Sequence, residues 1–276
     1  MQIYLSKGEK RRFGVTVALM CRSVVPNFSA GRRLHRKQLT AEKSRSRFVT
    51  YWSLIEPLLI GGIFVLLYQF RAISALDTGL PYALFVITGV MFWQSLVDAV
   101  NQPLGAIQRS RDLLLNTHVQ PEALMWCALI RATYNAAFRA IIALAFILYF
   151  LEPSPIFVLL GFTYFFVFTW LACGLGFLLE PFNAIAEDVT TAVNLILRPL
   201  LFVSGVLFPV VGVAQLEMYI GYNPFLIIVE NFRSITFGFP MYEQATLVTI
   251  AGTFFMLFLC AWYVFHLSVR LVVEKG

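Results

Sequence analysis

Four charged residues interrupt long apolar stretches of the sequence: Glu56, Arg131, Arg139 and Arg198. A charge at mid-bilayer costs roughly 2.5–3.5 kcal/mol on insertion scales, so such side chains are expected to face protein or water. They are candidates for lining a pathway for a polar substrate. The alternative is that they snorkel or form structural ion pairs without touching substrate, and the depths of Glu56 and Arg131 allow those two to pair.

The sequence offers little for covalent or metal chemistry. The three histidines are far apart, and the four cysteines are isolated, without the spacing of metal ligands. The nearest candidate for an enzyme is the acidic group Glu180, Glu187 and Asp188, which can equally cap a helix and complement its dipole. We therefore predict no catalytic residue and no metal site, and a multispan membrane enzyme is the less favoured class.

A nucleotide-binding loop is also missing from the sequence. No Gly is followed five positions later by Gly-Lys-Ser/Thr, so the chain has no such loop to cradle ATP phosphates. If this protein transports a substrate actively, the energy must come from elsewhere. We predict no cofactor in this chain.

The composition indicates a membrane protein. Hydrophobic residues make up 59% of the 276 residues and charged residues only 13%, about half of what a soluble domain carries. Twelve of the 21 Lys and Arg residues lie in the first 50 positions, a pattern of membrane orientation rather than of nucleic-acid binding. Residues 1–50 are predicted to be a cytoplasmic basic segment with an amphipathic helix on an anionic leaflet, its apolar piece broken at Pro26.

Apolar runs elsewhere predict six transmembrane helices in an all-α fold. The runs cover residues 53–70, 80–100, 123–151, 156–179, 189–213 and 245–267. Sixteen Lys and Arg residues lie in the N-terminal segment, the 102–122 connector and the tail, whereas the connectors on the opposite side carry 2. Both termini are therefore predicted to be cytoplasmic.

Between the fifth and sixth runs, the sequence predicts a re-entrant helical hairpin over residues 212–239. Asn223 and Pro224 suit the start of a helix, since Asn caps free amides and Pro is tolerated at the first helical position. The helix that follows, at roughly 14 residues and about 21 Å, is too short to cross. Glu230 and Arg233 are placed to pair, or to bond the exposed backbone ends of the other half of the hairpin. An ordinary extracellular loop helix is the alternative.

Three groups of residues, in this order and spacing, resemble the membrane subunit of type-2 ABC exporters, and among these the capsular polysaccharide export permeases of Gram-negative bacteria. The resemblance covers roughly residues 45–270 and is more specific for the superfamily than for the glycan. The matching residues are Ser46-Arg47-Phe48 with Trp52-x-x-x-Glu56-Pro57, Leu113-Leu-Leu-Asn-x-x-Val119-x-Pro121-Glu122, and Ser204-Gly205-Val-Leu-Phe-Pro209 with Asn223-Pro224 and Glu230-x-x-Arg233.

The resemblance implies a half-transporter that forms a homodimer and binds two separate ATPase subunits, which would hold ATP and Mg. Such a permease would move lipid-linked capsular polysaccharide across the bacterial inner membrane to a periplasmic adaptor and an outer-membrane channel. A related permease for O-antigen, teichoic acid or a drug is the alternative.

Two groups of residues take roles from this resemblance. A coupling helix at about residues 109–117 would seat on the ATPase, and a plain cytoplasmic turn is the alternative there. The re-entrant hairpin would form the outer gate. The coupling residues are Arg109, Arg111, Asp112, Leu113, Leu114, Leu115, Val119 and Pro121, and the gate residues are Pro209, Asn223, Pro224, Glu230 and Arg233.

Overall fold

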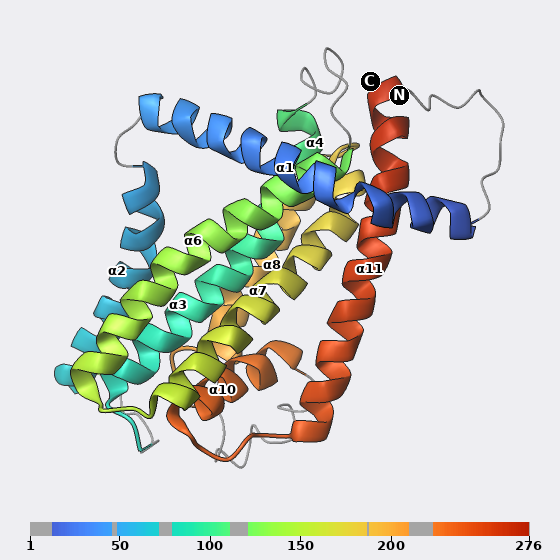
Figure 1. Ribbon diagram of the computed structural model, residues 1–276. Coiled ribbons are helices and arrows are strands. Elements are labelled where there is room, and N and C mark those ends of the chain that lie inside the picture. The colour runs from blue at the N-terminus through green and yellow to red at the C-terminus, as the bar shows by residue number, and fades with distance from the viewer. Residues whose placement is uncertain are drawn as a thin grey trace.

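The computed structural model describes residues 13–45, 49–71, 79–110, 121–186, 188–209 and 223–275, and within these ranges it is helical, without strands. Figure 1 shows a bundle of long helices with one helix lying across its end. The helices are α1 (Phe13–Arg45), α2 (Val49–Gln69), α3 (Tyr82–Asn101), α4 (Ala106–Arg109), α6 (Pro121–Phe150), α7 (Pro155–Asn183), α8 (Asp188–Val203), α10 (Pro224–Phe237) and α11 (Gln244–Lys275).

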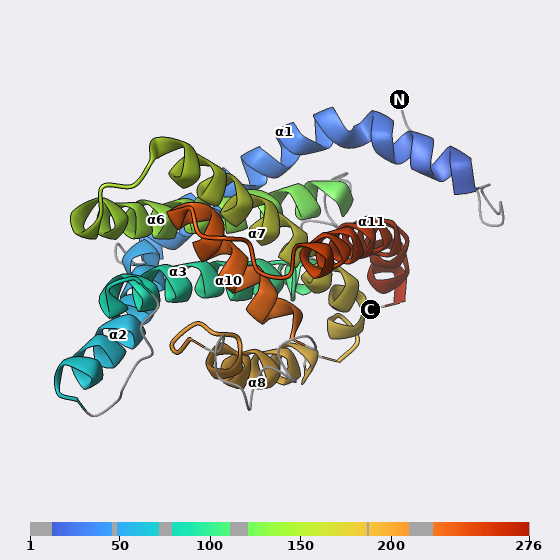
Figure 2. The same ribbon diagram turned by 90° about the horizontal axis from the view of Figure 1, so that it is seen from below.

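Four of these helices are long and apolar enough to cross a membrane: Tyr82–Asn101, Glu122–Phe150, Pro155–Asn183 and Gln244–Leu267. They agree with four of the six predicted runs, and they indicate a membrane protein. The first of them is 78% buried, against 17–33% for the other three, so α3 is the central helix of the bundle. It packs against α2, α6 and α7, and α7 in turn packs against α11 and α10. Figure 2 shows these helices from below.

The predicted fifth span, residues 189–213, is not one continuous helix. Helix α8 is 16 residues long and ends at Val203, because the chain turns at Ser204 and Gly205. Gly205 has φ +67°, a left-handed conformation that is easily adopted only by glycine. The broken segment therefore begins near Gly205, earlier than the predicted hairpin at residue 212. Residues 210–222 lie outside the described residues.

The predicted break at Pro26 is wrong, since α1 continues through this residue. Packing explains the difference: Asn27 and His35 are buried, and α1 lies along α6. A Cβ added to Gly31 would lie 2.5 Å from Cβ of Trp126, so the glycine permits the close approach of the two helices. This tertiary contact outweighs the one backbone hydrogen bond that Pro26 removes.

A cluster of phenylalanines fixes the short helix α10 against the bundle. Phe232 of α10 lies with its ring centroid 4.6 Å from Phe92 of α3 and 5.7 Å from Phe165 of α7. All three side chains are almost fully buried. Because burying a phenylalanine stabilises by about 1.5–3 kcal/mol, this cluster holds α10 at the end of the bundle opposite α1 and α4, as Figure 1 shows.

Candidate functional site

A cavity of about 590 Å³ lies among α2, α3 and α8, with one residue from α6. Part of its lining is polar and part is apolar, so it could hold an amphiphile. The polar lining consists of Glu56, Gln94, Asp98, Asn101, Arg139, Asn194 and Arg198, and the apolar lining of Ile60, Ile63, Phe64, Trp93, Val97, Leu197, Leu201 and Phe202. Three of the four predicted intramembrane charges therefore meet at one cavity.

One of these charges is held by a structural ion pair. Arg139 of α6 is 4% exposed, and its Nη1 lies 3.0 Å from Oδ2 of Asp98 on α3. The amide of Asn135 also donates to Asp98, at 2.9 Å. The Asp98–Arg139 pair joins α3 to α6 at the cavity wall and leaves little net charge there.

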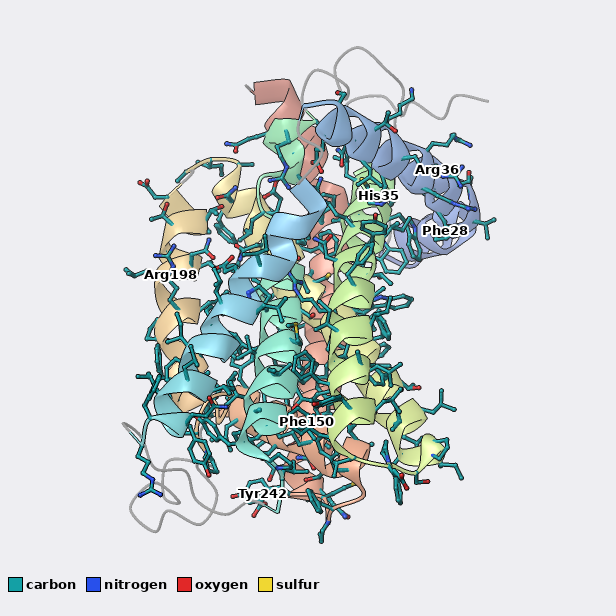
Figure 3. The ribbon with its side chains drawn as sticks, turned by 90° about the vertical axis from the view of Figure 1, so that its left-hand side faces the viewer. Phe28, His35, Arg36, Phe150, Arg198 and Tyr242 are labelled. Atoms are coloured by element: carbon teal, nitrogen blue, oxygen red, sulfur yellow. The ribbon has the colours of Figure 1, made fainter. Side chains whose placement is uncertain are left out.

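Glu56 and Arg198 remain at the cavity with exposed side chains. Among the described residues, neither forms an ion pair with a protein group. Figure 3 shows Arg198 on α8, inside the length of the bundle. A guanidinium group in this position can donate two parallel hydrogen bonds to a phosphate or carboxylate.

The fourth predicted charge, Arg131, lies away from the cavity and does not pair with Glu56. Its Nη2 is 2.6 Å from Oε1 of Glu42 on α1, so the pair fastens α1 to α6. Burial and, secondarily, the nearby Arg131 lower the pKa of His35 on the same face of α1 below its ordinary value of 6.5. This region is a structural contact between α1 and the bundle.

At the start of α10, the predicted cap is present. Oδ1 of Asn223 accepts hydrogen bonds from the backbone N–H groups of Phe225 (3.0 Å) and Leu226 (3.3 Å), and Pro224 is the first helical residue. The Asn223 amide nitrogen also donates to the carbonyl of Val203 at 3.2 Å. Asn223 therefore caps α10 and ties it to the end of α8.

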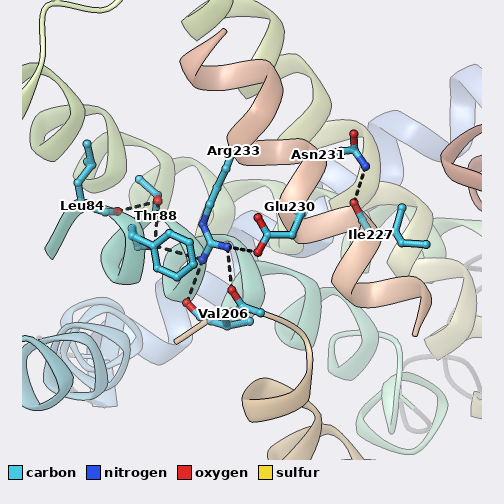
Figure 4. A network of polar contacts seen from close by, with 9 residues as sticks. Leu84, Thr88, Val206, Ile227, Glu230, Asn231 and Arg233 are labelled. Atoms are coloured by element: carbon cyan, nitrogen blue, oxygen red, sulfur yellow. Dashed lines mark hydrogen bonds and ion pairs between the residues drawn. The ribbon is translucent and has the colours of Figure 1, made fainter. Parts of the chain in front are cut away.

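Arg233 bonds the broken backbone that follows α8. It is 2% exposed, and its guanidinium donates to the carbonyls of Gly205 (2.7 Å), Val206 (2.9 Å) and Phe85 (3.2 Å). Its Nη1 also lies 3.0 Å from Oε1 of Glu230, as Figure 4 shows. The predicted ion pair with Glu230 is therefore present, whereas the backbone carbonyls that Arg233 reaches lie before residue 212 and in α3, outside the predicted hairpin.

The remaining residue predicted for the gate, Pro209, is the last residue described before position 223, and no hydrogen bond of the described residues involves it. Sequence reasoning missed Gly89, against which Arg233 packs: a Cβ there would collide with Nη2 of Arg233 and the carbonyl of Val206. A glycine inside an otherwise apolar span was the signal available, since such a residue often marks a close contact.

The predicted coupling segment is described only at its two ends. Helix α4 ends at Arg109, where the predicted helix begins, and Pro121 starts α6. Arg109 donates to the carbonyls of Leu104 and Gln102, each at 2.9 Å. Arg109 therefore stabilises its own turn. The other predicted coupling residues lie outside the described residues: Arg111, Asp112, Leu113, Leu114, Leu115 and Val119.

Sequence reasoning also missed the polar side of α3 at the cavity. Gln94, Asp98 and Asn101 follow one another at intervals of four and three residues, which places them on one face of the helix. The same spacing in the sequence was the signal for a polar stripe.

Comparison with known proteins does not assign this chain to a family. The chain matches no protein-family model and has no significant match among curated proteins.

Proposed function

We propose that this protein is the permease subunit of an ATP-driven exporter that moves lipid-linked capsular polysaccharide across the bacterial inner membrane. The observation that carries the proposal is the cavity among α2, α3 and α8. Its apolar lining suits a lipid chain, and its amide and charged groups suit sugar hydroxyls and an anionic linkage. Arg198 is the candidate for binding the anion, because Arg139 is already paired with Asp98.

The orientation of the helices supports a six-span arrangement. In Figure 1, α2, α3, α6, α7, α8 and α11 run alternately in opposite directions along the bundle. The ends of α11 and α1 lie at the same end as α4, which agrees with an even number of crossings. In this proposal that end is cytoplasmic, following the excess of Lys and Arg there. Helices α2 and α8 then complete the six spans with the four apolar helices.

The segment from Gly205 to α10 is the proposed re-entrant gate. Irregular backbone at membrane depth is tolerated only where protein or water satisfies it. Arg233 and Asn223 supply such bonds to the carbonyls of Gly205, Val206 and Val203. The gate lies at the end of the bundle away from α4, which is the exit side in this proposal.

Energy comes from partner subunits in this proposal. Two copies of the chain form the permease, and two ATPases that bind ATP and Mg seat on the segment between Arg109 and Pro121. The turn that leads into this segment is at the same end as α1 (Figure 1) and is braced by Arg109. A periplasmic adaptor and an outer-membrane channel receive the glycan.

Substitution of Arg198 tests the proposal. In cells lacking the native permease, Arg198→Glu should reduce surface polysaccharide at least about tenfold, because a repulsive carboxylate replaces a phosphate-binding group. Arg198→Lys should retain part of the export, and Arg33→Glu on the exposed face of α1 is the charge-matched control. Val97→Trp should reduce export by narrowing the cavity. Normal surface polysaccharide in both Arg198→Glu and Val97→Trp, at equal expression, would refute the assignment of the cavity.

A further inference from the structure

The last turn of α7 carries two buried polar side chains that belong to neither the cavity nor the gate. Glu180 is fully buried and Asn183 is 2% exposed. Burying a carboxylate is costly unless its hydrogen bonds are satisfied, so the partners of Glu180 are informative. Two of those partners, Gly105 and Ile107, lie far away in the sequence.

Glu180 holds the turn between α3 and α4. Its carboxylate accepts hydrogen bonds from the backbone N–H of Gly105 and, at 2.7 Å, from that of Ile107. Gly105 is the N-cap residue of α4 and has φ +76°. These two hydrogen bonds engage both oxygens of the buried carboxyl group. The carboxylate therefore fixes α4 to the end of α7.

Asn183, one turn further along α7, caps α8. Its Oδ1 accepts hydrogen bonds from the backbone N–H of Thr190 at 3.1 Å and from the Thr190 hydroxyl at 2.7 Å. Thr190 lies in the first turn of α8, where backbone N–H groups have no partner within the helix. The Asn183 amide nitrogen also lies 3.5 Å from Oε2 of Glu180. The two caps are thus in contact with each other.

The contacts continue from α8 to the cavity. Asn194, one turn after Thr190, donates to the Thr190 carbonyl at 2.9 Å. Asn194 and Asn101 of α3 exchange amide hydrogen bonds of 3.0 and 3.2 Å, and both line the cavity. An unbroken series of hydrogen bonds therefore runs from α4 to the cavity wall.

We propose that Glu180 and Asn183 are positioning residues that link α4 to α8, so that a displacement of α4 is transmitted to the wall of the cavity. The direct bonds between the two side chains and both helix starts give the link its physical basis. Only the origin of the displacement, an ATPase pulling on the segment after α4, rests on the proposed function.

Hydrogen exchange on the full chain in detergent tests this link without any transport assay. In Glu180→Gln, an NH2 group replaces one carboxylate oxygen and faces one of the two backbone N–H donors, which then lacks an acceptor. Hydrogen exchange at the backbone amides of Gly105 and Ile107 should therefore accelerate about tenfold or more. Asn183→Ala should do the same at Thr190. The link predicts reciprocal effects: Glu180→Gln also accelerates exchange at Thr190, and Asn183→Ala at Ile107. Thr169→Val, which removes a hydroxyl that bonds only within α7, is the matched control and should change neither site.

Reciprocal acceleration, absent in the control, supports the link. Acceleration confined to the element that each side chain caps would overturn it, because the two residues would then be independent caps. Unchanged exchange in both variants would overturn it as well. Since export is not measured, none of these results depends on whether the chain is an exporter.

Discussion

Replacing Arg233 by Met should strongly destabilise the fold, because this side chain satisfies several buried groups at once. The substitution leaves the carbonyls of Gly205, Val206 and Phe85 without the guanidinium, and it leaves the Glu230 carboxylate without its ion pair. Removing one partner of a buried ion pair costs about 3–5 kcal/mol. We expect a loss of at least this size, since the bonded carbonyls add to it.

The free energy of unfolding can be measured by titrating the purified chain in mild detergent with SDS. Arg198→Met is the matched control, since that arginine is exposed at the cavity, and its effect should stay within about 0.5 kcal/mol. Adding Glu230→Gln to Arg233→Met should recover part of the loss, because the uncompensated carboxylate is then neutral. A cost below about 1 kcal/mol for Arg233→Met would refute the reasoning that Arg233 holds the broken backbone together.

Two further predictions concern the topology and the gate. In a cysteine-free background, single cysteines at Ser74 and Glu217 should react with an impermeant reagent from outside the inner membrane. A single cysteine at Gln108 should react only after permeabilisation. Labelling at Gln108 in intact cells would contradict six spans with both termini inside. Replacing both Asn223 and Pro224 by Ala should abolish export while the chain still inserts, because the cap, worth about 1 kcal/mol, and the rigid first turn of α10 are lost. Normal surface polysaccharide in this double variant would refute the gate.

Local sequence features predicted the start of α10 and the pairing of Glu230 with Arg233. Asn223 and Pro224 have preferences that act within one helical turn, so their roles can be recognised without a fold. Glu230 and Arg233 are three residues apart, a spacing that brings side chains together on any helix. The same spacing cannot say which carbonyls the guanidinium reaches. Those carbonyls, including that of Phe85, depend on how α3 packs beside the broken segment.

Contacts between distant helices could not be predicted in the same way. The similar depths of Arg131 and Glu56 allow the two to pair, yet Arg131 pairs with Glu42, which the packing of α1 along α6 brings close. The end of α8 was placed too late, since Gly205 stands inside an apolar run and its positive φ is a property of the fold. In the sequence, Glu180 stands out only as an acid near a helix start. Its role at the α4 turn could not be recognised, because its partner Ile107 is 73 residues away.

The most direct test of the proposed permease function is ATP-driven transport in inside-out membrane vesicles that contain this chain and the proposed partner ATPase. We predict that ATP drives uptake of lipid-linked polysaccharide into these vesicles. Uptake should be lost with Leu114→Asp, which should prevent the ATPase from seating, and with Arg198→Glu, which leaves the ATPase bound. ATP-dependent uptake that is the same in vesicles with and without this chain would contradict the assignment of the protein as the permease.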